Sequence, residues 1–239
     1  MLSLIGAGGK TTTLYRLAWE LWQEGSKVLV STTTKIFKPT SPHIHKLYLT
    51  QDLEALRLEL AKIKEALIVG VGYGLDDGGK LIGLPPDWFG ALGRGADVDW
   101  ILIEADGAGS RPFKVPLEYE PVVPEGCPLT VWVMGIKVLA RPLTPDWVHR
   151  AGRAATLLGV EVGTPLTENL ILRLIEDPEG CFRGVPSKGR KVALINQADS
   201  TEELKQAREL GRAFIQHGIE RVVITSYLGR NAVKEVIGI

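Results

Sequence analysis

The sequence has little cysteine, no net charge and no long hydrophobic run. Its 239 residues include two isolated cysteines, which is too few for a disulfide framework and the wrong spacing for a C-x-x-C zinc site. The 28 basic residues balance the 28 acidic ones, so charge gives no reason to expect nucleic acid or an anionic membrane as a partner. No apolar run approaches the ~20 residues of a membrane span, and no signal peptide is evident. We therefore expect a cytoplasmic protein.

What the sequence does contain is a large apolar fraction arranged in alternating elements. Hydrophobic residues make up 45% of the chain, enough for one core over residues 1–239. Short buried strands alternate with amphipathic helical patterns, which predicts an α/β fold with three layers, a mostly parallel sheet flanked by helices. The predicted strands are Leu2 to Ile5, Lys27 to Ser31, Lys46 to Thr50, Ala66 to Val71, Trp100 to Ile103, Leu129 to Met134, Val192 to Ile195 and Val222 to Thr225.

Three stretches depart from this simple alternation. Residues 137–188 are mostly helical in pattern, with helix starts expected at Thr144-Pro145-Asp146 and at Thr167, and we interpret them as a helical lobe inserted in the domain. Residues 72–86 are rich in glycine and proline and predict a loop or hairpin. Ser200 and Glu203 have the spacing of a capping box, which predicts a helix running to about Gly218.

The most informative stretch is a glycine turn between the first strand and the first helix. Its G-x-x-G-K-T pattern is shorter than the standard phosphate loop, G-x-x-x-x-G-K-[ST], but strand, turn and helix come in the required order. Such a loop points backbone N–H groups and a lysine at phosphate oxygens, and its threonine binds Mg²⁺. We therefore expect a P-loop NTPase-like fold that binds Mg²⁺ and ATP or GTP through Gly6, Ala7, Gly8, Gly9, Lys10, Thr11 and Thr12, with Lys10 as an exposed loop charge. The alternative is an ordinary glycine-rich turn.

Acidic residues follow the strand Trp100 to Ile103. Glu104 and Asp106 stand where a phosphate-loop fold places its metal ligands and the groups that orient an attacking water. Two registers of the D-x-x-G pattern fit, Glu104 to Gly107 and Asp106 to Gly109, and the sequence does not choose between them. With Lys10, these two carboxylates are the candidate catalytic residues, and with Thr11 they are the candidate metal ligands.

Further polar residues follow the other predicted strands. The hydroxyls of Thr32 to Thr34, with Lys35, stand where nucleotide switches sense the γ-phosphate and metal, although threonine is also common in strands. Arg111 and Lys114 are suited to phosphate or an anionic substrate, or are ordinary solvated charges.

A candidate base-reading motif lies near the C-terminal end. Asn196 and Asp199 occur in the order of the N-K-x-D motif by which GTPases read guanine, with Gln197 in place of the lysine. The next strand ends in Thr225-Ser226-Tyr227, and the order of these two strand ends resembles that of the base-reading elements of GTPases. An asparagine and aspartate before a helix are equally consistent with a structural cap.

The histidines carry weaker signals. His43 and His45 have the spacing of two metal ligands on one strand, but no third ligand is evident, which favours a loop position without metal. His149 is expected on the surface of a helix in the lobe, or facing the cleft.

Taken together, these motifs resemble those of the YqeC family. The resemblance covers nearly the whole chain and rests on Gly6-Ala-Gly-Gly-Lys-Thr-Thr, Thr32-Thr-Thr-Lys, Glu104-Ala-Asp-Gly, Arg141-Pro-Leu with His149-Arg150, and Asn196-Gln-Ala-Asp. That family is described as an accessory protein of selenium-dependent molybdenum hydroxylases. The resemblance implies a cytoplasmic maturation factor that acts on a molybdenum hydroxylase or its cofactor and uses a nucleotide as energy source or switch.

The residues leave several functions open. One is an NTPase or an ATP-dependent kinase or ligase with a small-molecule substrate, in which Lys10 and Mg²⁺ neutralise charge during phosphoryl transfer. Another is a nucleotide-gated chaperone that releases a partner when a switch segment moves. A nucleotide-binding scaffold without turnover is disfavoured because the lysine, threonine and carboxylates are all present.

Overall fold

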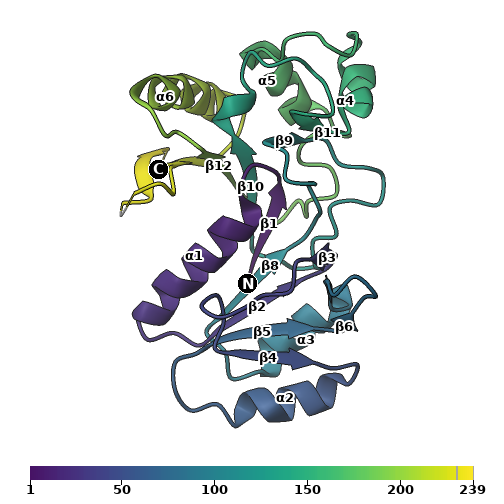
Figure 1. Ribbon diagram of the computed structural model, residues 1–239, viewed down its shortest axis with the longest axis vertical. Helices are drawn as coiled ribbons and strands as arrows, with labels where there is room; N and C mark the ends of the chain where they lie inside the picture. The colour runs from purple at the N-terminus through teal and green to yellow at the C-terminus, as the bar shows by residue number, and fades with distance from the viewer. Residues whose placement is uncertain (230, 239) are drawn as a thin grey trace.

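The computed structural model describes residues 1–229 and 231–238, and a long twisted sheet runs through the molecule (Figure 1). In the described part, nine strands lie in the order β14-β13-β12-β10-β1-β8-β2-β5-β4, and only β13 and β14 pair antiparallel. This confirms an α/β fold with a mostly parallel sheet. The strands are β14 (Val233–Ile237), β13 (Arg221–Thr225), β12 (Arg190–Asn196), β10 (Leu129–Gly135), β1 (Leu2–Gly6), β8 (Trp100–Glu104), β2 (Val28–Thr32), β5 (Ile68–Gly72) and β4 (Lys46–Leu49).

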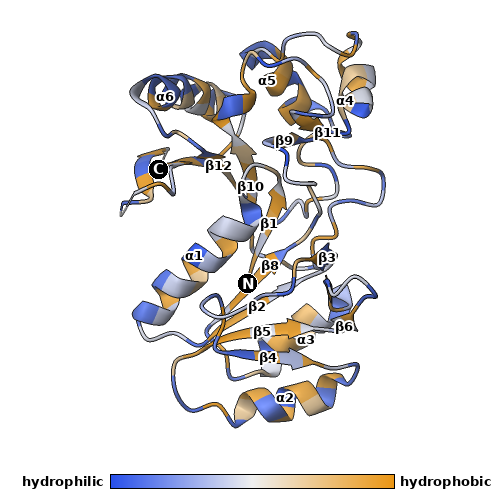
Figure 2. Cartoon of the chain, viewed as in Figure 1, coloured by the Kyte–Doolittle hydropathy of each residue, from blue (hydrophilic) through white to orange (hydrophobic). Residues whose placement is uncertain are grey.

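Helices cover both faces of this sheet. One face packs against α1 (Lys10–Gln23), whose buried Leu14 and Ala18 belong to the same hydrophobic cluster as Leu2 and Leu4 of the central strand. Because side chains alternate along a strand, Ile5 points to the opposite face and joins the other core cluster. Figure 2 shows the resulting pattern, with apolar strands in the interior and mixed polar and apolar colouring along the helices.

The opposite face is covered by the remaining long helices. These are α2 (Leu53–Ala61), α3 (Pro86–Gly95) and α6 (Thr201–Gln216). Their buried side chains, among them Leu60, Phe89 and Phe214, join one cluster with the apolar residues of the strands. The capping box predicted at Ser200 is present and begins α6.

The stretch from residue 137 to 188 contains a 3₁₀ turn, η1 (Ile136–Val138), and two short helices, α4 (Ala151–Leu158) and α5 (Glu168–Glu176). Thr167 caps α5 as predicted. The helix start predicted at residues 144–146 is wrong, because these residues form a turn in which the carbonyl of Thr144 accepts from the N–H of Val148. Instead β11 (Val148–His149) pairs with β9 (Phe113–Lys114), so this region is tied to the segment that follows β8.

The hairpin predicted over residues 72–86 is confirmed. Strands β6 (Gly74–Leu75) and β7 (Leu81–Ile82) pair antiparallel, and β7 also pairs with β3 (Lys35–Ile36). The hairpin turn therefore lies next to the segment that follows β2. Among the described residues, no helix has the length and apolar character needed to cross a membrane.

Candidate functional site

The glycine turn between β1 and α1 adopts a conformation that only glycine fits well. Gly6, Gly8 and Gly9 all have positive φ, at 89°, 77° and 125°. A Cβ at Gly8 would lie 2.2 Å from the backbone nitrogen of Gly135, and one at Gly9 would lie 2.4 Å from Nδ2 of Asn196. The glycines thus allow the loop to pass against β10 and β12, as the sequence pattern requires.

The backbone N–H groups of this loop divide into two sets. The first three have partners within the protein. The N–H of Gly6 donates to Asp106 Oδ2, that of Ala7 to the carbonyl of Val133, and that of Gly8 to the carbonyl of Arg111, at 2.8 to 3.0 Å. The next four, of residues 9–12, donate to no atom of the described chain. They stand at the N-terminal end of α1, where the helix dipole also favours an anion. Residues 6–8 therefore anchor the loop to the rest of the protein, and residues 9–12 have N–H groups available to a ligand.

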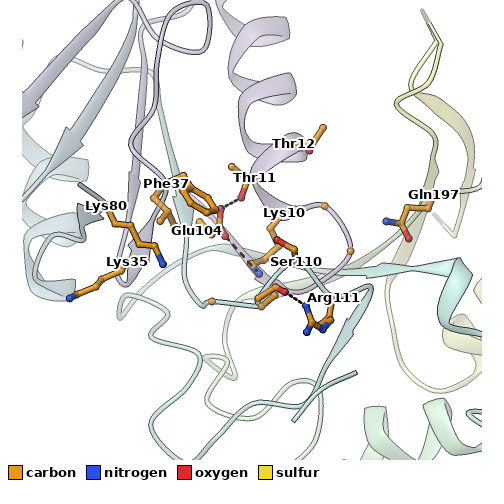
Figure 3. A pocket seen from close by; sticks show the side chains of 16 residues that line it. Lys10, Thr11, Thr12, Lys35, Phe37, Lys80, Glu104, Ser110, Arg111 and Gln197 are labelled. Carbon is orange, nitrogen blue, oxygen red and sulfur yellow. Dashed lines mark hydrogen bonds and ion pairs between the residues drawn. The ribbon is translucent and has the colours of Figure 1, made fainter. Parts of the chain in front are cut away.

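Residues 9–12 line a cavity of about 650 Å³ (Figure 3). Gln197 lies at one end of it, and Lys35, Phe37 and Lys80 lie at the other. This is within the range of small-molecule sites. The cavity is lined by Gly8, Gly9, Lys10, Thr11, Thr12, Lys35, Ile36, Phe37, Lys80, Glu104, Gly107, Ala108, Gly109, Ser110, Arg111 and Gln197.

Lys10 lies at the floor of the cavity and is only 3% exposed. Its Nζ donates to the carbonyl of Gly6 at 2.6 Å and pairs with Asp106 Oδ1 at 3.0 Å. The prediction of an exposed loop charge was therefore wrong, because the loop carbonyl and the Asp106 carboxylate hold the ammonium group against the loop.

Glu104 and Asp106 take different positions. Glu104 lines the cavity, and its Oε2 accepts a hydrogen bond from Thr11 Oγ1 at 2.7 Å. Burial raises its pKa, an effect that Lys10 and Thr11 offset only in part. Asp106 lies behind the loop, 1% exposed, and joins the N–H of Gly6 to the ammonium of Lys10.

Behind Asp106 runs a chain of buried ion pairs. Lys114 is fully buried and pairs with Asp106 at 3.1 Å and with Glu120 at 2.8 Å, and Glu120 also pairs with Arg150. Burial alone would raise the pKa of Glu120, but the hydrogen bonds from Arg150 and Lys114 outweigh it and lower the pKa to about 2. Lys114 is thus neither a solvated charge nor a residue of the cavity wall, whereas Arg111 does line the cavity.

The threonines at and after the end of β2 are already hydrogen-bonded. Thr32 Oγ1 donates to the carbonyl of Glu104 at 2.7 Å, and Thr33 Oγ1 donates to that of Val122 at 2.8 Å. Thr34 lies 3.2 Å from Thr32, oxygen to oxygen. Lys35 is the member of this stretch that reaches the cavity.

Asn196 contacts the glycine loop, and neither Asn196 nor Asp199 lies in the cavity wall. Asn196 Nδ2 donates to the carbonyl of Gly8 at 2.8 Å, and its Oδ1 accepts from Thr225 at 3.0 Å. Asp199 accepts from Ser226 Oγ and pairs with Lys137, each at 2.6 Å. Burial would raise the pKa of Asp199, but the hydrogen bonds from Lys137 and Ser226 outweigh it and lower the pKa. Both motif residues are therefore held in fixed positions.

The histidines have separate contacts in the structure. His43 stacks on Tyr15, with ring centroids 4.6 Å apart, and Nδ1 of His45 accepts from the N–H of Ile68. His149 lies in β11 rather than on a helix surface, and burial together with the charges of Arg150 and Lys114 lowers its pKa. Within the described ranges, no group of three or more His, Cys, Asp or Glu side chains is arranged to hold a metal.

Four cavity residues were missed by the sequence analysis, and one of them, Ile36, lies in β3. Phe37, Lys80 and Ser110 lie in loops, and no motif marks them. Lys80 lies close to the cavity because the hairpin strand β7 pairs with β3. This contact joins distant segments, so a local sequence pattern does not reveal it.

Comparison with known proteins identifies the family. The model of the family described as YqeC protein matches residues 2–152, which is more than half of the chain. The chain belongs to the YqeC family. This YqeC-family chain is also 32% identical to a protein named "Uncharacterized protein YqeC" from Escherichia coli (strain K12), over 222 residues that cover 93% of this chain and 85% of the relative. The family match includes the glycine loop and both carboxylates, and the relative's alignment spans most of the sheet.

Proposed function

We propose that this protein binds a magnesium–nucleotide complex in the 650 Å³ cavity and hydrolyses it, as an NTPase with a P-loop-like site. The observation that carries the proposal is the row of four spare N–H groups at residues 9–12, in a stretch that lines the cavity together with Lys10. Phosphate oxygens are acceptors with negative charge, so they satisfy both the N–H groups and the lysine.

The oxygen donors beside Lys10 fit a magnesium ion. Thr11 and Glu104 supply a hydroxyl and a carboxylate within 2.7 Å of each other at the edge of the same cavity. Oxygen ligands of this type suit Mg²⁺, which commonly binds through one or two carboxylates plus substrate phosphates. When bound, the ion would neutralise charge on the phosphates. Asp106 does not line the cavity, and its ion pair with Lys10 instead positions that lysine.

The position of Asn196 and Asp199 supports a nucleotide whose base lies near Gln197. Asn196 buttresses the phosphate-binding side of the loop through Gly8, and Ser226 fixes the Asp199 carboxylate. Lys137 holds the other oxygen of this carboxylate, and Asp199 lies outside the cavity lining, so a guanine base beyond Gln197 would replace Lys137 as its partner. On the order of the Asn196 to Asp199 motif, we favour GTP over ATP.

The biological setting comes from family membership alone. We propose that the protein acts in the maturation of a selenium-dependent molybdenum hydroxylase or its cofactor. A second function, an ATP-dependent small-molecule kinase or ligase, is favoured by the cationic far end of the cavity, where Lys35 and Lys80 could receive an anionic substrate.

Thermal unfolding with Mg·GTP, Mg·ATP or either nucleotide plus EDTA tests the binding proposal. A ligand at a hundred times its Kd stabilises the folded state by about 2.7 kcal/mol, so we expect a clear rise in Tm with Mg·GTP that EDTA reduces. Phosphate release stimulated by an apo-hydroxylase would support the accessory role, and stimulation by a small anion would support the kinase or ligase. No rise in Tm with either nucleotide would contradict the proposal.

A further inference from the structure

A second cavity of about 420 Å³ adjoins the first along the side of α1. The two cavities share Thr11, Thr12 and Phe37 in their linings, so they meet at the start of the helix. The motifs described above do not account for this second cavity, and Lys80 is not part of its lining.

The walls of this second cavity are aromatic. Tyr15 and Trp19 come from successive turns of α1, and Phe37 and His43 come from the segment that follows β3. Phe37 is 74% exposed and Trp19 is 44% exposed, so their rings are available to a ligand. Stacking of His43 on Tyr15 ties the loop to the helix and fixes the distance between the two walls.

The charge of the second cavity is positive. Arg16 and Lys38 line it, and its lining contains no Asp or Glu. The guanidinium of Arg16 lies 5.4 Å from the ring centroid of Trp19 and also pairs with Glu20. In the described part of the chain, Lys38 makes no ion pair, so its charge is available to an anion. Aromatic faces combined with cations select a flat ring that carries negative charge.

We infer that this cavity is a binding site for a planar heteroaromatic ligand with an attached phosphate or similar anionic group. The ring stacks on the walls formed by Trp19 and Phe37, and the anionic group lies by Lys38 and Arg16. Trp19 and Lys38 line the second cavity and not the first, so a ligand that they hold lies beside the nucleotide site without occupying it.

Flavin mononucleotide and riboflavin are a matched pair of probes, since they share the ring and differ in the phosphate. Titration with the protein should quench flavin mononucleotide fluorescence to saturation, and riboflavin should bind at least about tenfold more weakly. Trp19→Ala and Lys38→Glu should each weaken flavin mononucleotide binding about tenfold or more. Both residues are exposed, so neither change should unfold the protein.

Matched controls are Leu58→Ala and Lys205→Glu, which remove an exposed apolar side chain on α2 and reverse an exposed charge on α6. Both should bind flavin mononucleotide as the wild type does. Lys10→Met tests whether the probe sits on the glycine loop instead. Loss of probe binding in Lys10→Met with no change in Trp19→Ala, or equal binding of the two flavins, would overturn the inference. The Trp19→Ala protein should still bind Mg·GTP, so a failure of the nucleotide proposal is detected separately.

Discussion

At the scale of single residues, the site is organised by the difference between two carboxylates. Glu104 faces the cavity and has a raised pKa, whereas Asp106 is enclosed by the ammonium groups of Lys10 and Lys114. A buried carboxylate with incomplete charge compensation costs folding free energy and is typical of sites that await a cation. The negative charge of Asp106 is already compensated within the protein by Lys10 and Lys114.

Replacing Glu104 with glutamine should therefore stabilise the empty protein. Its pKa in the folded state lies above the ordinary value, so above that range the ionised group destabilises the fold, and the neutral amide removes this cost. We expect a higher Tm for Glu104→Gln at pH 7, with the gain shrinking as the pH falls and the wild-type group becomes protonated. Thermal unfolding from pH 4 to 8 measures this, with Glu125→Gln on the surface as control. A lower Tm for Glu104→Gln at pH 7 would contradict the account.

At the scale of elements, the glycine loop is fixed by three neighbours. It contacts β10 through Ala7, the segment after β8 through Gly8, and β12 through Asn196. The parallel sheet brings these strand ends to one edge, which is why residues nearly 200 positions apart meet at the loop.

Asp199 tests whether the end of β12 reads the base. Asp199→Ala should weaken binding of GTP about tenfold to a hundredfold, the value of hydrogen bonds to a charged group, and leave ATP binding unchanged. Competition titrations with both nucleotides measure this, and Glu202→Ala on the first turn of α6 serves as control. Equal effects on ATP and GTP would reduce Asp199 to a structural partner of Lys137 and Ser226.

At the scale of the whole molecule, the buried ion pairs connect the site with the α4 region. One chain of ion pairs runs from the cavity to the residue that precedes α4. Its members are, in order, Lys10, Asp106, Lys114, Glu120 and Arg150. Removing one member of such a chain leaves a buried charge without its partner, which typically costs about 3–5 kcal/mol.

Because of Glu120, the free energy of unfolding should fall at acid pH. Its pKa is about 2 in the folded state, below the ordinary value of 4.5, so its contribution is fully present above pH 4.5 and is lost as the pH falls toward 2. Glu120→Gln should be less stable than the wild type at pH 7, and the difference should shrink across that window. Urea unfolding at a series of pH values measures it. A difference that stays constant from pH 7 to pH 2 would exclude this role for Glu120.

The sheet was predictable because periodicity and turn residues are local signals. The strands, α1, the capping box at Ser200 and the 72–86 hairpin were found in this way. The sequence did not predict the burial of Lys10 and Lys114 or the position of Lys80 in the cavity wall. Each of these depends on contacts between segments that are distant in the sequence. The start of α4 was misplaced because a cap-like sequence at residue 144 forms a tight turn instead.

The most direct test of the central claim is calorimetric titration of Mg·GTP and Mg·ATP into the wild-type protein and the Lys10→Met variant. Methionine keeps much of the buried volume, and Asp106 retains Lys114 and the Gly6 N–H, so the variant should fold. The account predicts saturable binding by the wild type, tighter for GTP, and a loss of about tenfold to a hundredfold or more in the variant. Unchanged affinity in a folded Lys10→Met protein would contradict the assignment of the glycine loop as a phosphate site.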